Sequence, residues 1–167
     1  YNYDIPLLFL STCSNYGKTD EVVTEDSPLE PLGLYADSKI QAENIVLKND
    51  HLVLRMSTLF GVSYRVRYDI TINEFVYQYY RDKLLKVYGE DTWRPYLHVQ
   101  DACNMIIQCM EKDLRGVYNV GFNDLNYQKK EIVNTIVDYL GEGKLEYVNF
   151  DDPRDYKVNF DKIQKEL

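Results

Sequence analysis

The chain has 167 residues, which is enough for one full domain or two small lobes. Its composition, with 45% hydrophobic and 28% charged residues, is typical of a soluble globular protein. The formal net charge of −8 argues against a nucleic-acid-binding surface, which needs net basic character. No apolar run approaches the ~20 residues that span a bilayer. Three cysteines and two histidines match neither a disulfide framework nor a zinc-binding pattern. We therefore expect a cytoplasmic protein without a metal, a membrane or a nucleic-acid partner.

The chain opens with an apolar run at residues 7–10, which breaks at once into small polar residues at 11–15. This pattern predicts a buried strand that ends at an exposed edge, where its last side chains face a ligand. Because a central strand rarely opens a domain, and because no methionine precedes it, we expect this sequence to be a piece of a longer chain.

Residues 17–33 are acidic and rich in proline, which predicts a surface loop. The apolar spacing that follows predicts a helix over residues 34–50. Tyr35 and Lys39 stand at i and i+4, so a helix would place a phenol and an ammonium on the same face. Together with the hydroxyl of Thr12 at the strand end, these are the parts of a proton-relay site. The alternative is an ordinary surface tyrosine and lysine.

Residues 51–61 repeat the pattern of an apolar run that ends in small polar residues, which completes a strand–helix–strand unit with a parallel sheet and a right-handed crossover. The remaining segments alternate between helix and strand signals, so we predict an α/β fold. We expect loops at 62–73 and 90–95, helices at 74–81, 98–113 and 127–140, strands at 84–89, 116–121 and 144–150, and a final helix close to residue 167.

Five motifs now stand in order: STCSNYG at 11–17, YxxxK at 35–39, LRxxTLFG at 54–61, RPYLHVxDA at 94–102 and YNVG at 118–121. The ordered set resembles the extended short-chain dehydrogenase/reductase family and, within it, the NAD-dependent sugar-nucleotide epimerases and dehydratases. The resemblance implies a Rossmann-type domain that binds NAD or NADP, followed by a smaller α/β lobe that binds a nucleotide-diphosphate sugar.

The resemblance also implies a division of the chain. Residues 1–61 would form the C-terminal part of the NAD-binding domain, with 96–113 packing back onto it. Residues 62–95 and 114–167 would form the sugar-nucleotide-binding lobe.

The glycine-rich dinucleotide turn of the family is absent from the sequence. Of eight glycines, only Gly141 and Gly143 stand at GxG spacing, and they follow a predicted helix. The fingerprint must instead follow a strand and open a helix. We therefore expect the N-terminal, glycine-rich half of the family's domain to be missing from these 167 residues.

For catalysis, the resemblance implies that Tyr35 is the general acid/base, exchanging a proton with the sugar while hydride passes to or from nicotinamide. Lys39 would favour the phenolate and hold the nicotinamide ribose. Thr12 matches the hydroxyl residue that hydrogen-bonds the reacting oxygen. Leu59 would be a further cofactor contact.

The two residues after Thr12 distinguish reactions within the family. In the 4,6-dehydratases that this chain resembles, these positions hold an Asp and a Glu, which serve as acid and base for the loss of water. Here they are Cys13 and Ser14, whose side chains are poor substitutes, so dehydration is disfavoured. Cys13 is either an acid/base for a 3- or 5-epimerisation or a small buried spacer. Thr58 stands where many relatives carry a substrate-contacting asparagine.

Several further residues match the family's substrate contacts. Asn73 matches an asparagine whose amide meets the diphosphate. Arg94 and Arg154 match two arginines that clamp the diphosphate in the family. A planar guanidinium group can make paired hydrogen bonds to phosphate oxygens. The alternative is that both arginines form ordinary surface salt bridges. Lys86 and Tyr88 align with the strand beside the nucleotide base, where Tyr88 either stacks or simply packs.

The sequence therefore predicts an NAD-dependent sugar-nucleotide epimerase that acts through a transient keto-sugar. One alternative is a nucleotide-sugar reductase or dehydrogenase, and another is an inactive, truncated sugar-nucleotide-binding fragment. Relatives often dimerise through a four-helix bundle containing the YxxxK helix, so the resemblance implies a homodimer.

Overall fold

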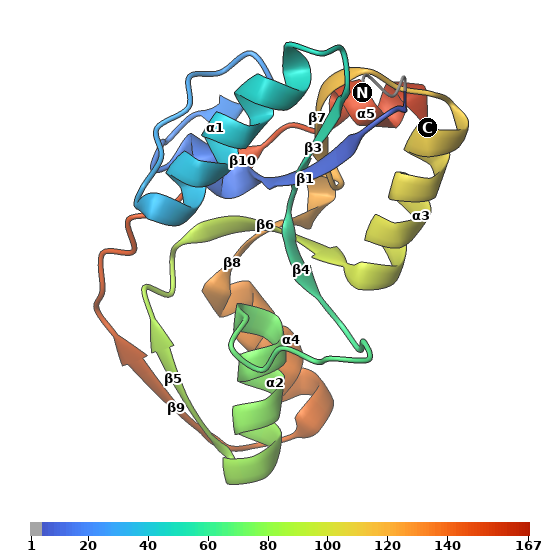
Figure 1. The fold of residues 1–167 in the computed structure, drawn as a ribbon. Coiled ribbons are helices and arrows are strands. Elements are labelled where there is room, and N and C mark those ends of the chain that lie inside the picture. The colour runs from blue at the N-terminus through green and yellow to red at the C-terminus, as the bar shows by residue number, and fades with distance from the viewer. Residues whose placement is uncertain (1–4) are drawn as a thin grey trace.

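In the computed structural model, which describes residues 5–167, three parallel strands form the sheet of a first body (Figure 1). They are β1 (Leu8–Thr12), β3 (Leu52–Met56) and β7 (Gly116–Val120), in the order β1-β3-β7. All of β3 is buried, as expected of a central strand covered on both faces. Helix α1 (Leu34–Leu47) connects β1 to β3, which confirms the predicted strand–helix–strand unit.

The two faces of this sheet pack differently. Because side chains alternate along a strand, Leu52, Leu54 and Met56 share one face of β3 and Arg55 points to the other. The first face joins a large apolar core with helix α3 (Val99–Glu111) and helix α5 (Asp161–Glu166). On the opposite face, Arg55 meets Glu43 of α1.

A second body is built from two strands and two helices (Figure 1). Strand β5 (Leu84–Tyr88) pairs in parallel with β9 (Lys144–Val148), and helices α2 (Thr71–Asp82) and α4 (Lys129–Leu140) pack together beside them. This body has its own apolar core, formed by Phe75, Tyr79, Leu85, Val87, Val133 and Ile136.

A third small sheet joins the two bodies. Strand β6 (Trp93–His98) lies between β4 (Thr58–Phe60), to which it is parallel, and β8 (Asn126–Gln128), to which it is antiparallel. The remaining short elements are the 3-10 helices η1 (Cys13–Tyr16) and η2 (Asn123–Leu125) and the parallel strand pair β2 (Val22–Val23) and β10 (Lys157–Val158). None of the helices described is long and apolar enough to cross a membrane.

Three sequence predictions need correction. Residues 90–95 were expected to form a loop, but β6 begins at Trp93 and is buried along most of its length. Its first half pairs with β8 and its second half pairs with β4. Residues 114–167 were expected to lie in the second body, but β7 pairs with β3 and α5 packs against β7. The segment 51–61 also forms two strands rather than one, interrupted at Ser57.

Candidate active site

A cleft of about 1100 Å³ is lined by residues of both bodies. One wall comes from the carboxyl ends of β1 and β3 and from the start of α1, and the other comes from α2, β5, Arg94 of β6 and the segment around Asp152. The crevice beyond the carboxyl ends of parallel strands is where open α/β sheets bind ligands.

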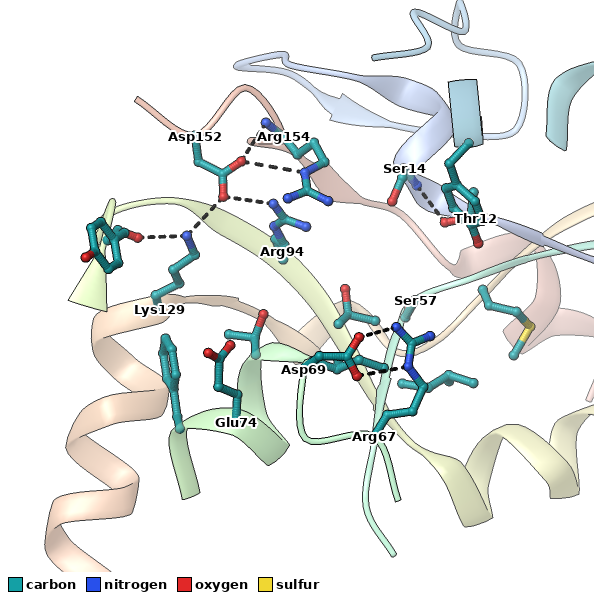
Figure 2. A pocket seen from close by; sticks show the side chains of 18 of the residues that line it. Thr12, Ser14, Ser57, Arg67, Asp69, Glu74, Arg94, Lys129, Asp152 and Arg154 are labelled. Carbon is teal, nitrogen blue, oxygen red and sulfur yellow. Dashed lines mark hydrogen bonds and ion pairs between the residues drawn. The ribbon is translucent and has the colours of Figure 1, made fainter. Parts of the chain in front are cut away.

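Thr12 lies at the carboxyl end of β1, where the strand turns into the short helix η1. Its Oγ1 accepts a hydrogen bond of 3.1 Å from the backbone N–H of Ser14, which caps that helix (Figure 2). The Ser14 Oγ lies 3.4 Å from the hydroxyl of Tyr156. Thr12 and Ser14 both line the cleft.

Tyr35 and Lys39 reach the same wall from the first turns of α1. Lys39 Nζ donates a 2.9 Å hydrogen bond to the carbonyl oxygen of Leu10 and lies 5.8 Å from the centre of the Tyr35 ring. The Tyr35 side chain is 61% exposed. The structure therefore brings Thr12, Tyr35 and Lys39 to the end of β1. Thr58 and Leu59 of β4 line the same cleft.

Helix α1 is held to the sheet by a buried ion pair that the sequence analysis did not assign. The carboxylate of Glu43 accepts hydrogen bonds from Arg55, at 3.1 Å from Nε and 2.8 Å from Nη2, and from the side chains of Ser11 and Asn15. Burial acts to lower the pKa of Arg55, but the hydrogen bonds and charge interactions with Glu43 and Tyr16 together outweigh it and raise the pKa above its usual value. The local signal for this pair is Arg55, a charged residue within the otherwise apolar strand β3.

Two of the predicted substrate contacts lie outside the lining of the cleft. Cys13 is buried in the core, where its Sγ donates to the carbonyl oxygen of Arg55 at 3.2 Å, and burial raises the pKa of its thiol. Asn73 uses its amide to hold the preceding loop: its Oδ1 accepts from the Gly61 N–H at 3.0 Å, and its Nδ2 donates to the Arg67 carbonyl oxygen at 3.0 Å.

The other predicted contacts do line the cleft. Lys86 pairs with Glu146 at 3.4 Å. Tyr88 is 49% exposed and packs edge-on against Phe150, with ring centres 6.2 Å apart. Arg154 is also exposed, at the rim of the same wall.

Asp152 lies at the centre of a cationic cluster, as Figure 2 shows. Its Oδ2 accepts from Arg94 Nη2 at 2.9 Å and from Lys129 Nζ at 3.0 Å, and its Oδ1 accepts from the backbone N–H of Arg154 at 3.0 Å. Burial acts to raise the pKa of Asp152, but Arg94, the Arg154 N–H and Lys129 lower it to about 2. Because three cationic side chains surround one carboxylate, the cluster keeps a net positive charge.

Sequence reasoning found Arg94 and Arg154 but missed Lys129 and Asp152. A lysine at the start of a helix and an aspartate beside a proline are ordinary surface patterns, so no local signal marks them. Arg94 is itself buried, and its Nε has no hydrogen-bond partner among the described residues. Across residues 5–167, no three His, Cys, Asp or Glu side chains gather as ligands for a metal ion.

Residues 2–121 match the sequence pattern of the NAD dependent epimerase/dehydratase family. The chain belongs to this family. Two curated members are the UDP-glucuronate 4-epimerase of Thermodesulfobacterium geofontis, 27% identical over 95% of this chain and 51% of its own length, and the low-salt glycan biosynthesis protein Agl12 of Haloferax volcanii, 29% identical over 84% and 48%.

Among solved structures, the dTDP-glucose 4,6-dehydratase of Bacillus anthracis in complex with NAD is 31% identical, with a TM-score of 0.83 over 96% of this chain and 55% of that one. This likeness confirms the expected Rossmann-type α/β fold. The chain spans about half the length of the relatives it matches. Its relatives in the epimerase/dehydratase family include both an epimerase and a dehydratase, so membership of the family does not by itself select one reaction.

Proposed function

We propose that this chain supplies the proton-transfer groups and the sugar-nucleotide site of an NAD-dependent sugar-nucleotide epimerase. The observation that carries the proposal is the shared cleft: Thr12, Tyr35 and Lys39 line one wall, and the cationic cluster of Arg94 and Arg154 lines the other. A substrate that spans the cleft would meet acid/base groups at one end and phosphate-binding groups at the other.

The cationic wall fits a nucleotide diphosphate. Guanidinium groups bind phosphate oxygens through paired, charge-assisted hydrogen bonds, and both Arg94 and Arg154 line the cleft. Tyr88, with half of its surface exposed on β5, provides a flat ring for the nucleotide base. The names of the relatives agree with this class of substrate, since they include UDP-glucuronate and dTDP-glucose.

Tyr35 would take the proton from a sugar hydroxyl as that carbon is oxidised, and would return the proton when the keto-sugar is reduced on its other face. The Lys39 ammonium, held near the phenol by Leu10, would stabilise the phenolate through its opposite charge. The Thr12 hydroxyl would hydrogen-bond the reacting oxygen. Bound NAD supplies the acceptor and donor of hydride in such a reaction.

The residues present fit the nicotinamide end of NAD or NADP. Tyr35, Lys39 and Leu59 line the cleft at the carboxyl edge of the parallel strands, where a nicotinamide and its ribose would meet them. A pyrophosphate cradle is not among these residues, because the sequence has a single GxG pair, Gly141 and Gly143, and it lies between a helix and a strand.

The residues after Thr12 favour epimerisation over dehydration. Loss of water from the sugar needs an acid and a base near the substrate. Cys13 is buried away from the cleft with a raised thiol pKa, and Ser14 offers a hydroxyl beside that of Tyr156. Neither side chain is a carboxylic acid, so these positions would not perform the elimination.

The test uses the intact protein with NAD and two substrates taken from the names of the relatives, UDP-glucuronic acid and dTDP-glucose. Products are followed by NMR and NADH by its absorbance. An epimer without net change in NADH would support the proposal. Stoichiometric consumption or release of NADH would instead support a reductase or dehydrogenase, and a 4-keto-6-deoxy product would refute the argument from Cys13 and Ser14.

Two related outcomes complete the test. The protein would be a binding fragment if it retains a nucleotide sugar, identified by mass spectrometry, but turns over neither that compound nor the two substrates above.

We also propose a homodimer through α1, on which Leu34 and Ile45 are 87% and 65% exposed. A monomeric sedimentation profile would contradict that assembly.

A further inference from the structure

Lys129 and Asp152 connect four separate segments of the second wall. Lys129 opens α4, and besides pairing with Asp152 its Nζ donates to the carbonyl oxygen of Tyr88 on β5 at 2.8 Å. Asp152 holds Arg94 of β6 and the backbone of Arg154. The side chains of Lys129, Asp152 and Arg94 are at most 10% exposed, so this junction is an interior feature rather than a set of surface ion pairs.

The junction determines how Arg94 meets the cleft. One nitrogen of its guanidinium, Nη2, is bound to Asp152, while its buried Nε is left without a partner among the described residues. Arg94 lines the cleft with another part of its side chain, because the Nε itself is buried. The bond from Nη2 to Asp152 fixes one edge of the guanidinium and so sets which way the group lies in the wall of the cleft.

The charge of Asp152 does not explain why a carboxylate lies at the centre of this cationic cluster. A carboxylate among the cations weakens the attraction of the cluster for any anion, and the low pKa of this side chain keeps it ionised at neutral pH. A buried carboxylate that opposes anion binding by its charge can assist it only by geometry. Asp152 can assist in this way because its hydrogen bonds to Arg94, Lys129 and the Arg154 backbone fix the positions of these groups.

We propose that Lys129 and Asp152 are positioning residues that hold Arg94 and Arg154 ready for the diphosphate of a nucleotide sugar. The inference rests on the proposed substrate class. It adds that the cationic wall is organised before the ligand binds, and that the affinity depends on this internal junction as well as on the two arginines.

The paired variant Lys129→Met with Asp152→Asn tests the proposal, because it removes the junction while leaving the net charge of the cluster unchanged. Removing both partners also avoids stranding one buried charge. The probes are UDP and dTDP, measured by calorimetry on the intact protein. We expect affinity to fall by at least about tenfold, as for the loss of an ionic hydrogen bond. The matched control is Lys18→Met with Asp151→Asn, an exposed ion pair, which should leave affinity unchanged.

The single variant Asp152→Asn tests whether the affinity for UDP rises or falls when the negative charge is removed. If charge dominates, this change makes the cluster more positive and tightens binding of UDP; if position dominates, binding weakens. In turnover assays we expect KM to rise while kcat stays within about threefold, because the proton-transfer groups lie on the opposite wall. Should the paired variant fail to fold, Asp152→Glu keeps the charge and moves the carboxylate by one methylene, and weaker binding is again expected.

The proposal is overturned if the paired variant, or Asp152→Glu in its place, binds UDP and dTDP within twofold of wild type, or if Asp152→Asn binds them more tightly. A wild-type protein that binds neither nucleotide at millimolar concentration would instead refute the proposed substrate class. The two failures are therefore distinguishable.

Discussion

The ion pair between Glu43 and Arg55 should be the main attachment of α1 to the sheet. Along its 14 residues this helix buries only Ala36, Glu43 and Val46, so apolar packing contributes little to holding it. Glu43 and Arg55 are 2% and 4% exposed, and the Glu43 carboxylate also accepts from Ser11 and Asn15. Removing one partner of a buried ion pair typically costs about 3–5 kcal/mol, because the other charge is left unpaired. We predict that Glu43→Ala lowers the free energy of unfolding by this amount.

Urea titration of wild type and variant measures this free energy, with circular dichroism as the signal. Asp37→Ala is the matched control, since Asp37 is an exposed acid on the same helix, and it should cost less than about 1 kcal/mol. The paired variant Glu43→Met with Arg55→Met should lose less than Glu43→Ala, because it leaves no buried charge, although Ser11 and Asn15 lose their acceptor. A loss below about 1 kcal/mol for Glu43→Ala would refute the claim that this pair attaches the helix.

Two further predictions concern ionisable groups. Because the pKa of Asp152 is lowered to about 2 in the folded state, its carboxylate stabilises the fold above pH ~4, by about 2 kcal/mol, and this contribution is lost as the pH falls toward 2. The difference in unfolding free energy between wild type and Asp152→Asn should therefore shrink from pH 4 to pH 2, and a constant difference would contradict this assignment. Among the thiols, Cys103 is exposed, whereas Cys13 and Cys109 are buried with raised pKa values, so brief alkylation of the native protein followed by peptide mapping should label Cys103 alone. Rapid labelling of Cys13 would show that it is open to the cleft.

Local patterns were sufficient to predict the elements that carry the proposed proton-transfer groups. An apolar run that ends in Thr12 predicts a strand end, and the i, i+4 spacing of Tyr35 and Lys39 predicts a shared helix face. Both signals depend only on neighbouring residues. The structure places these three side chains in one cleft because the first turns of α1 pack beside the carboxyl end of β1, where Lys39 hydrogen-bonds the Leu10 carbonyl oxygen.

The cationic wall could not be predicted in this way. Arg94 and Pro95 are typical of loops, yet they lie in a buried strand, because the charge of Arg94 is met by Asp152, 58 positions later. Lys129 is buried for the same reason, although its position at a helix start is typical of the surface. Asn73 shows the converse: its residue type suits a phosphate contact, but its amide is used to hold the loop at Gly61 and Arg67. Such pairings depend on distant segments and leave no local pattern.

The most direct test of the central claim is the turnover of Tyr35→Phe. The intact protein is assayed with NAD and with the nucleotide sugar that it epimerises, and binding of the matching nucleoside diphosphate is measured in parallel. Loss of a general acid/base should lower kcat by about 10²–10⁴-fold, while nucleotide affinity stays at the wild-type value because the cationic wall is intact. A Tyr35→Phe protein with near wild-type turnover would contradict the assignment of this cleft as the site of proton transfer.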